Sequence, residues 1–312
     1  MRVVFMGTPE FAVPSLAAIS KKHEVLAVVT QPDRKRGRGQ KVSFSPVKAW
    51  AVENEYKVWQ PKRVSNPQFI TKLQSLKADA VVVVAFGQLI PDEILTATPY
   101  GCINLHSSLL PKYRGASPIN AAIINGEKET GVTTMYLNSQ WDAGDIILQE
   151  KEGISPRDTA GTLHDRLMVK GAHLLVETLR QIEEGVAPRI PQNHADATYA
   201  YKLSKDDGFV DFTKSALQLD CLIRGMNPWP VAYTVVGGER IKIWEASPRE
   251  GKGEPGRVID VTEQGLVVGC GKGLLSLEVV QRPNSRSITG RDLANGLRLS
   301  VGDYLVGGSY ET

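Results

Sequence analysis

The sequence has few cysteines and no long apolar run, and these two absences narrow the class of protein. Its three cysteines, Cys102, Cys221 and Cys270, form neither a C-x-x-C pair nor an even set, so we interpret them as reduced thiols of an intracellular protein. The longest apolar run has seven residues, whereas a membrane-spanning helix needs about 20. A short strand-like run follows Met1 and Arg2 directly, unlike the apolar region of a signal peptide. We therefore expect a soluble, cytoplasmic protein with no membrane partner.

Several motifs that would identify a cofactor or a nucleophile are also missing. Gly7-Thr8-Pro9 follows the first expected strand but lacks the further glycines of a dinucleotide fingerprint. The sequence has no Walker A motif and no G-x-S-x-G motif. Its five histidines show no metal-ligand spacing, and we expect no metal. The net charge of +3 is too small to indicate nucleic-acid binding by itself.

The sequence does contain a globular composition long enough for two domains. Of 312 residues, 42% are hydrophobic and 23% charged, which is ordinary for folded proteins. The first half alternates apolar runs with helical patterns, and the run at 79–86 is β-branched without alternation, as in a strand buried on both faces. This pattern predicts an α/β domain with a Rossmann-like, mostly parallel sheet over residues 1–188. The expected strands are 3–6, 25–30, 79–86, 101–106, 132–137 and 146–149, and the expected helices are 11–21, 46–55, 67–77, 118–125 and about 159–184.

The pattern changes in the second half of the chain. Residues 189–205 are rich in proline and small polar residues without periodicity, and we interpret them as a linker. Residues 206–312 contain one helical pattern, 216–226, and about five short strand patterns separated by glycine-marked turns. Such strands predict a small OB-like β-barrel. This part holds 12 Lys and Arg against 14 Asp and Glu, so the positive charge lies in the first half.

Asn104 and His106 point most directly to chemistry. If 101–106 is a strand, residues two apart share a face, and both side chains project together from its carboxyl end. Open α/β sheets bind ligands in the crevice at that end. An amide donor beside an imidazole can polarise a carbonyl group and stabilise a developing oxyanion. A turn-capping asparagine next to a packed histidine gives the same pattern, so both interpretations stand.

Asp142 lies in an Asp-Ala-Gly-Asp loop between two expected strands. A carboxylate there can reach back to His106, hold one tautomer of its ring and favour the protonated form. Aspartate before glycine is also a common turn former. The loop at 107–115, with Pro111 and Gly115, either shapes a wall of the same pocket or simply connects a strand to a helix.

A basic segment follows the second expected strand. It places five cations within eight residues and contains no acid among them: Arg34, Lys35, Arg36, Arg38 and Lys41. The glycines between them keep the segment adaptable, and cationic loops of this kind suit nucleic-acid phosphates. A solvated surface loop explains the same residues equally well.

Together these residues resemble those of the folate-dependent formyltransferases. The resemblance rests on Asn104-x-His106, on the Ser108–Pro111 run and on Asp142 in an Asp-x-Gly loop. Four further segments are similar to the branch of the family that acts on methionyl-tRNA: Gly7-Thr8-Pro9, Gln31-Pro32-Asp33, Ala85-Phe86-Gly87 and Asn227-Pro228-Trp229-Pro230. The similarity runs from residue 2 to about residue 305.

The resemblance implies a reaction and a site. A formyl group would pass from 10-formyltetrahydrofolate to the α-amino group of methionine on initiator tRNA. Asn104 would polarise the formyl oxygen, His106 would stabilise the developing charge, and Asp142 would orient the histidine. The implied folate site consists of Gln88, Leu89, Ile90, Ser108, Leu109, Leu110, Pro111, Leu137 and Gln140. The resemblance also implies a cis bond between Leu110 and Pro111.

Methionyl initiator tRNA is the partner that the resemblance implies. The basic segment would enter the acceptor stem, with Arg38 at the position of its key arginine, and the C-terminal domain would hold the tRNA. A local basic face there would use Lys242, Arg282, Arg286, Arg291 and Arg298, and relatives suggest a monomer. The alternatives are a formyltransferase for an amino-sugar nucleotide or another small amine, a hydrolase that releases formate from the same folate, and a nucleic-acid-binding protein with an inactive first domain.

Overall fold

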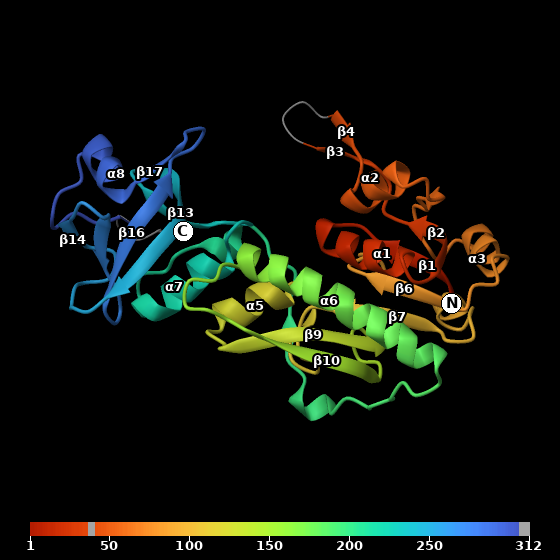
Figure 1. The fold of residues 1–312 in the computed structure, drawn as a ribbon. Helices are drawn as coiled ribbons and strands as arrows, with labels where there is room; N and C mark the ends of the chain where they lie inside the picture. The colour runs from red at the N-terminus through yellow and green to blue at the C-terminus, as the bar shows by residue number, and fades with distance from the viewer. Residues whose placement is uncertain (37–40, 306–312) are drawn as a thin grey trace. The chain divides into compact units, whose positions relative to one another are not determined.

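The structure is a computed structural model that describes residues 1–36 and 41–305. The chain divides into two compact units (Figure 1). The first consists of Met1–Pro118, Glu129–Gly153 and His164–Ala200, and the second of Ile119–Lys128, Ile154–Leu163 and Tyr201–Thr312. Two segments from the region predicted as the first domain therefore belong with the C-terminal part, so the units are not separated by a single cut.

The first unit is built on a seven-stranded sheet. Strands β7, β6, β1, β2 and β5 run parallel; at one edge, β9 is antiparallel to β7 and β10 is antiparallel to β9. The mostly parallel sheet predicted from the sequence is thus confirmed. In sheet order the strands are β10 (Ile146–Gly153), β9 (Glu129–Tyr136), β7 (Cys102–His106), β6 (Ala80–Val84), β1 (Arg2–Gly7), β2 (Glu24–Val29) and β5 (Val58–Trp59).

The apolar runs explain why the parallel strands lie in the centre of the sheet. All five residues of β6, Ala-Val-Val-Val-Val, are buried, as expected for a strand covered on both faces. Side chains from β1 and β6 pack into one hydrophobic cluster with Trp59, Phe69 and Ile94. This cluster fixes the central strands, and their carboxyl ends therefore form a stable edge.

The helices begin where the sequence supplies caps. The Ser45 side chain accepts from the Lys48 amide at the start of α2, and the Asn66 side chain accepts from two amides at the start of α3. The helical elements of the first half are η1 (Glu10–Ala12), α1 (Val13–Ser20), α2 (Pro46–Glu53), α3 (Pro67–Gln74), α4 (Asp92–Leu95), α5 (Pro118–Ile124) and α6 (Ala160–Glu183), followed by η2 (His194–Asp196).

Some features of the first unit differ from a simple strand–helix alternation. The loop 137–145 joins β9 to β10 and is shorter than the dozen or so residues that a parallel crossover needs, so the chain returns antiparallel. The basic segment, expected as a loop, contains the antiparallel pair β3 (Arg34–Arg36) and β4 (Lys41–Ser43). A further short parallel pair joins β8 (Arg114–Gly115) to β11 (Tyr199–Ala200). Strand β11 belongs to the segment that we interpreted as a linker.

Helix α6 packs on one face of the sheet and leaves the other face to the site. Gly171 lies so close to Leu105 that a Cβ atom there would approach the leucine side chain to 2.7 Å. The Thr178 and Thr134 hydroxyl oxygens are 2.7 Å apart and join α6 to β9. Because side chains alternate along β7, Asn104 and His106 point to the face opposite Leu105.

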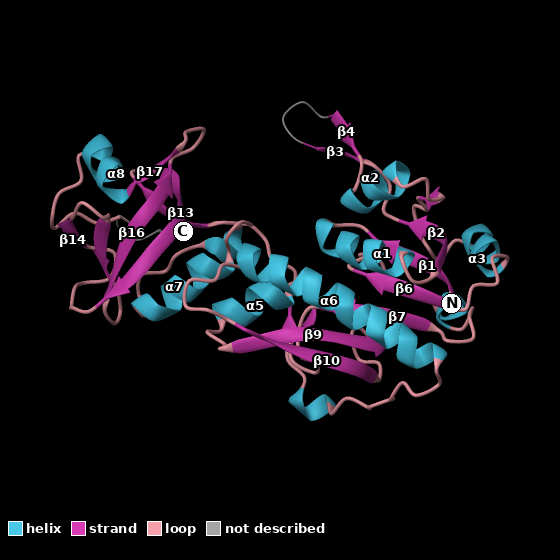
Figure 2. Cartoon of the chain, viewed as in Figure 1, coloured by secondary structure: helices cyan, strands magenta, loops and turns pink. Residues whose placement is uncertain are grey.

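The second unit contains a six-stranded antiparallel sheet (Figure 2). Its main order is β12 (Ala232–Val236), β13 (Glu239–Arg249), β16 (Leu274–Gln281), β15 (Leu266–Gly269) and β14 (Val258–Val261), and β17 (Ser287–Thr289) pairs with β16. Among the strands of the described residues, β12 and β14 end this order and are not paired with each other, so the sheet does not close. The OB-like barrel that we expected is therefore not confirmed, whereas the antiparallel strands are.

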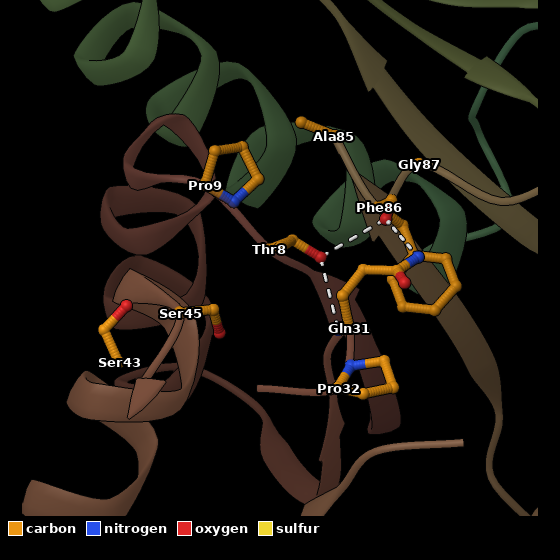
Figure 3. Close-up of a pocket in the computed structure, with 9 residues that line it drawn as sticks. All are labelled: Thr8, Pro9, Gln31, Pro32, Ser43, Ser45, Ala85, Phe86 and Gly87. Carbon is orange, nitrogen blue, oxygen red and sulfur yellow. Dashed lines mark hydrogen bonds between the residues drawn. The ribbon is translucent and has the colours of Figure 1, made fainter. Parts of the chain in front are cut away.

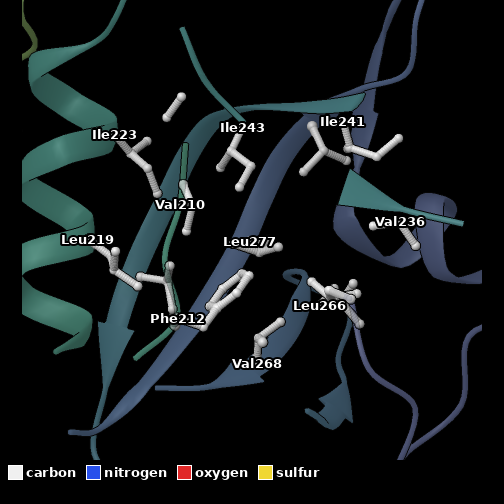
Figure 4. Packing of buried hydrophobic residues seen from close by; sticks show 14 of the residues in the cluster. Val210, Phe212, Leu219, Ile223, Val236, Ile241, Ile243, Leu266, Val268 and Leu277 are labelled. Carbon is white, nitrogen blue, oxygen red and sulfur yellow. The ribbon is translucent and has the colours of Figure 1, made fainter. Parts of the chain in front are cut away.

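The hydrophobic core of the second unit combines residues of one helix with residues of the sheet. Leu219 and Ile223 of α7 (Ala216–Gly225) pack with Ile241, Ile243 and Leu277 from the sheet (Figure 4). Ser215 and Gln218 form a reciprocal capping box at the start of α7. Three further elements were not predicted: η3 (Asp206–Gly208), β17 and α8 (Gly290–Leu297).

The search for membrane-spanning helices covered the part of the chain that the structure describes. No helix there is both long and apolar enough to cross a bilayer.

Candidate active site

The site is built at the carboxyl end of β7. Asn104 pairs in register with Val83 of β6 and Met135 of β9, and His106 pairs with Thr133 of β9. Both side chains are buried, and they share one face of the strand, as their spacing predicts. In residues 1–36 and 41–305, no group hydrogen-bonds to the side-chain amide of Asn104. This side chain can therefore donate to a ligand.

His106 is held between a backbone carbonyl and a carboxylate. Its Nε2 atom lies 2.9 Å from the Tyr113 carbonyl oxygen, and a carbonyl only accepts, so Nε2 carries a proton. Its Nδ1 atom lies 3.7 Å from Oδ2 of Asp142. When the ring is neutral, Nδ1 keeps a lone pair that can accept a proton. When the ring is protonated, Nδ1–H points towards a negative charge.

Asp142 is placed by an unusual loop conformation. Its φ angle is +48°, in the left-handed region that few residues other than glycine adopt. A Cβ atom at Gly144 would overlap the Tyr136 carbonyl oxygen, so glycine is required there. The Gly115 amide donates to Asp142 Oδ2 at 2.8 Å. The structure thus brings Asp142 to His106, which the sequence alone left open.

The Ser107–Gly115 loop lies against β9 and β10. The Ser108 hydroxyl donates to the Lys112 carbonyl within the loop, and Thr133 donates to the Ser108 carbonyl at 2.6 Å. Gln149 Nε2 donates to the Leu110 carbonyl at 2.9 Å. The expected cis bond between Leu110 and Pro111 is present. The loop is therefore a fixed wall beside Asn104 and His106 and not merely a connection.

The other predicted folate residues divide into two groups. Leu137 packs against the cluster that contains Leu110 and also against the central cluster that contains Ile90. Leu109 borders Gly131 of β9, where a Cβ atom would meet its side chain. Gln88 is anchored from below, because its Oε1 accepts from the Val64 amide. Leu89 and Gln140 are exposed, and Pro111 is half-buried in the loop.

A cavity of about 250 Å³ opens at the point where the strand order reverses (Figure 3). From β1 the chain passes to β2 on one side and later to β6 on the other, and such switch points bind ligands in α/β sheets. Thr8 Oγ1 donates to the Phe86 carbonyl and accepts from the Gln31 amide. The lining residues are Thr8, Pro9, Gln31, Pro32, Ser43, Ser45, Ala85, Phe86 and Gly87. The sequence did not identify this cavity, although three of its loops carry the resemblance.

Two findings concern the predicted tRNA residues. Arg34, Lys35, Arg36 and Lys41 belong to β3 and β4, and Arg38 lies outside the described residues. At the base of this hairpin, Lys48 Nζ lies 2.5 Å from the Asp33 carboxylate, and Gln60 Nε2 donates to the same group at 2.8 Å. The Lys48 and Gln60 hydrogen bonds lower the pKa of Asp33.

Two of the five cations expected to form a basic face in the second unit, Arg282 and Arg291, lie next to carboxylates. Arg282 makes two hydrogen bonds to the Glu239 carboxylate, at 2.7 and 2.9 Å. Arg291 lies 4.0 Å from Glu263, and Lys242 lies over the ring of Trp244.

Among the described residues, no group of three or more His, Cys, Asp or Glu side chains is arranged to hold a metal ion.

Models of known families match the chain twice. The formyl transferase model matches residues 1–179, and the model of the formyl transferase C-terminal domain matches residues 202–298. The chain belongs to the formyl transferase family. The first of these matches contains Asn104, His106 and Asp142, and the second contains most of the antiparallel sheet.

Relatives within the formyl transferase family cover the whole chain. A methionyl-tRNA formyltransferase of Acetivibrio thermocellus is 47% identical over 309 residues, which is 98% of this chain and 99% of that protein. One of Clostridioides difficile is 47% identical over 315 residues, 100% of this chain and 98% of that protein. The solved structure of WlaRD, a sugar 3N-formyl transferase in the presence of dTDP and 5-N-formyl-THF, has a TM-score of 0.68 at 20% identity. The match covers 92% of this chain and 99% of that chain, and it shows that the two share a fold.

Proposed function

We propose that this formyl transferase moves the formyl group of 10-formyltetrahydrofolate to the α-amino group of methionine on initiator tRNA. The observation that carries the proposal is the meeting of Asn104, His106 and Asp142 at the carboxyl end of β7. The two relatives named for this reaction, each 47% identical over nearly the whole chain, support the choice of acceptor. The sugar 3N-formyl transferase whose structure was solved in the presence of 5-N-formyl-THF supports the choice of donor.

The transfer begins when the acceptor amine attacks the formyl group, and Asn104 stabilises the charge that develops. The neutral amine attacks the formyl carbon, a new C–N bond forms, and the formyl oxygen becomes an oxyanion. A free α-amino group has a pKa of about 7.7–8.0, so part of it is neutral at pH 7. The free Asn104 amide donates to the oxyanion, and each such donor is worth about 3–4 kcal/mol in the transition state. The C–N10 bond then breaks.

Proton transfer completes the reaction. The attacking amine loses one proton, and the departing N10 of the folate gains one. His106 Nδ1 can hold this proton between the two events, because the Tyr113 carbonyl keeps Nε2 protonated throughout. Asp142 stabilises the imidazolium that forms. The net change is exchange of a formyl group and a proton, with no change of oxidation state.

The folate lies along the wall that the first unit provides. Ser108 to Pro111, Gln88 to Ile90, Leu137 and Gln140 line its site in this proposal. Leu137, packed between the cluster of Leu110 and the cluster of Ile90, provides an apolar surface that suits the flat pterin ring. The exposed Leu89 and Gln140 are placed to contact the donor once it is bound.

The tRNA contacts come from both units. The basic hairpin, through Arg34, Lys35, Arg36, Arg38 and Lys41, binds phosphates of the acceptor stem, and Asp33 anchors its base. The antiparallel sheet of the second unit acts as an OB-like surface for the same tRNA. We also predict that the enzyme works in the cytoplasm and as a monomer.

An acceptor comparison tests the proposal. The purified chain, supplied with 10-formyltetrahydrofolate, is given either methionyl initiator tRNA or an amino-sugar nucleotide at equal concentration. We expect formylated methionine from the first and less than about a hundredth of that rate from the second. A faster reaction with the sugar would overturn the assigned acceptor, and release of formate without transfer would indicate a hydrolase.

A further inference from the structure

Gln192, in the segment that the sequence presents as a linker, contacts the loop that carries Asp142. Its side chain is buried, and its Nε2 atom donates to the Asp142 carbonyl at 2.9 Å and to the Gly144 carbonyl at 2.8 Å. Both hydrogens of the amide are therefore used on either side of the turn. A two-point contact of this kind fixes the position and the rotation of the turn.

Arg114 fixes the orientation of Gln192. Its Nε and Nη2 atoms both donate to Gln192 Oε1, at 3.1 and 2.7 Å, and its Nη1 atom lies 3.2 Å from Nδ1 of His194. The guanidinium group is buried. With the amide reversed, its oxygen would face two carbonyl oxygens and its nitrogen would face a cation. Only the observed orientation satisfies all four hydrogen bonds.

The strand β8 and the residue that precedes it hold the other partners of the site. Tyr113 gives its carbonyl to His106, Arg114 holds Gln192, and the Gly115 amide donates to the Asp142 carboxylate. The strand is itself fixed, because the Arg114 amide donates to the Thr198 carbonyl at 2.8 Å. A Cβ atom at Gly115 would approach the Ala200 carbonyl oxygen to 2.6 Å, so the two segments are in close contact. Residues 190–200 therefore contact the Asp142 loop through Gln192 and its C-terminal side through the Ile146–Ile190 bridge, and they contact β8 through Thr198 and Ala200.

We infer that Gln192 is a positioning residue for the reaction and that Arg114 acts through it. The pair holds Asp142 at the distance from His106 at which its charge stabilises the imidazolium. The inference rests on the proposed function. It extends the site to a buried side chain whose polar partners are Arg114 and the carbonyls of the Asp142 loop. A displacement of about 1 Å in a catalytic group can lower a rate by about a hundredfold, so the effect falls on kcat.

Two variants of Gln192 separate positioning from anchorage. Gln192→Ala removes every contact. Gln192→Glu keeps an oxygen for Arg114, and so keeps the segment anchored, but turns a second oxygen towards the Asp142 and Gly144 carbonyls. Asn193→Ala is the matched control, because Asn193 has an amide side chain in the same segment and bonds locally to the Ala195 amide and to Asp196. Thermal unfolding shows whether each variant is folded. If Gln192→Ala is not folded, Gln192→Glu alone tests the positioning role.

Steady-state formylation of methionyl-tRNA gives the result. We expect both Gln192 variants to lose about tenfold to a hundredfold in kcat, with both KM values within about twofold of wild type and Asn193→Ala unaffected. In an Asp142→Asn background, Gln192→Ala should lower kcat by less than about a further twofold, because the carboxylate charge that Gln192 positions is already absent. An equal loss in both backgrounds, or a loss in KM alone, would overturn the inference. A wild-type chain inactive on tRNA would instead overturn the proposed function.

Discussion

The Nε2 atom of His106 lies 2.9 Å from the carbonyl oxygen of Tyr113. This contact fixes the ring so that Nδ1, the other nitrogen, faces Asp142. The histidine therefore has one nitrogen for structure and one for chemistry. Its backbone partner follows the loop that forms the wall of the site, so the position of the ring and the shape of the wall depend on each other.

Removal of the imidazole tests its catalytic role. We expect His106→Ala to lower kcat by at least about a hundredfold with little change in folate affinity, because a charge-stabilising and proton-holding group is lost. Single-turnover rates and folate binding measure the two effects. His173→Ala, at an exposed position of α6, is the control. A near-normal rate for His106→Ala would remove this residue from the mechanism.

Asn104 tests the oxyanion geometry. We expect Asn104→Asp to lose activity as severely as His106→Ala, because a repelling anion replaces the free donor beside the developing negative charge. The same change at the exposed Asn54 should leave the rate unaltered. Full activity of Asn104→Asp would show that the oxyanion forms elsewhere.

Arg38 tests the tRNA contact of the basic segment. We expect Arg38→Ala to raise KM for methionyl-tRNA and to reduce the slope of log affinity against log salt by about 0.7 to 0.9, as for one lost phosphate contact. Lys22→Ala, at an exposed site on the same unit, should keep the wild-type slope. An unchanged slope for Arg38→Ala would move the phosphate contact to another part of the chain.

Gly144 tests how closely the Asp142 loop is fixed. A methyl group at this position would overlap the Tyr136 carbonyl, so Gly144→Ala must shift the turn. We expect a loss of about tenfold or more in kcat and a lower unfolding temperature. Gly153→Ala is the control, since no atom lies within 4 Å of a Cβ atom there. Equal behaviour of the two variants would contradict the tight loop.

The cysteines test the cores of both units. Burial raises the pKa of Cys102 to about 12 and that of Cys270 to about 11, whereas only the thiolate reacts with alkylating reagents. Cys221 lines a cavity of about 740 Å³ in the second unit. Arg224 Nη2 donates to its sulfur at 3.3 Å.

We therefore expect iodoacetamide at pH 8 to modify Cys221 alone in the native protein and all three thiols in urea. Mass spectrometry of the peptides identifies the modified positions. Modification of Cys102 in the native protein as fast as that of Cys221 would contradict the packing of β7.

Period and propensity in the sequence predicted the central sheet and one half of the site. The run at 79–86 indicated a buried strand, and the two-residue spacing placed Asn104 and His106 on one face. The direction of β9 and β10 was not predictable from period, because alternation is the same in parallel and antiparallel strands. The reversal from β9 to β10 follows from the short loop between them, whereas the reversal from β7 to β9 spans the longer segment that contains α5.

The remaining site residues depend on contacts that no local pattern encodes. Asp142 reaches His106 through its left-handed backbone, the close approach at Gly144 and the Gly115 amide, all of which are tertiary features. Gln192 is one polar residue in a proline-rich stretch and gave no signal. Barrel closure likewise depends on which edge strands pair. Helix α8 was missed because its buried residues, Leu293 and Ala294, stand among charged and glycine residues.

The contact between Asp142 and His106 is the centre of the account, and Asp142→Asn tests it most directly. The variant keeps the shape of the side chain and removes only its negative charge. Single-turnover formylation of methionyl-tRNA, with donor and acceptor both saturating, reports the chemical step alone. The account predicts a rate at least about a hundredfold below wild type with unchanged dissociation constants for both substrates. A wild-type rate in this variant would contradict it.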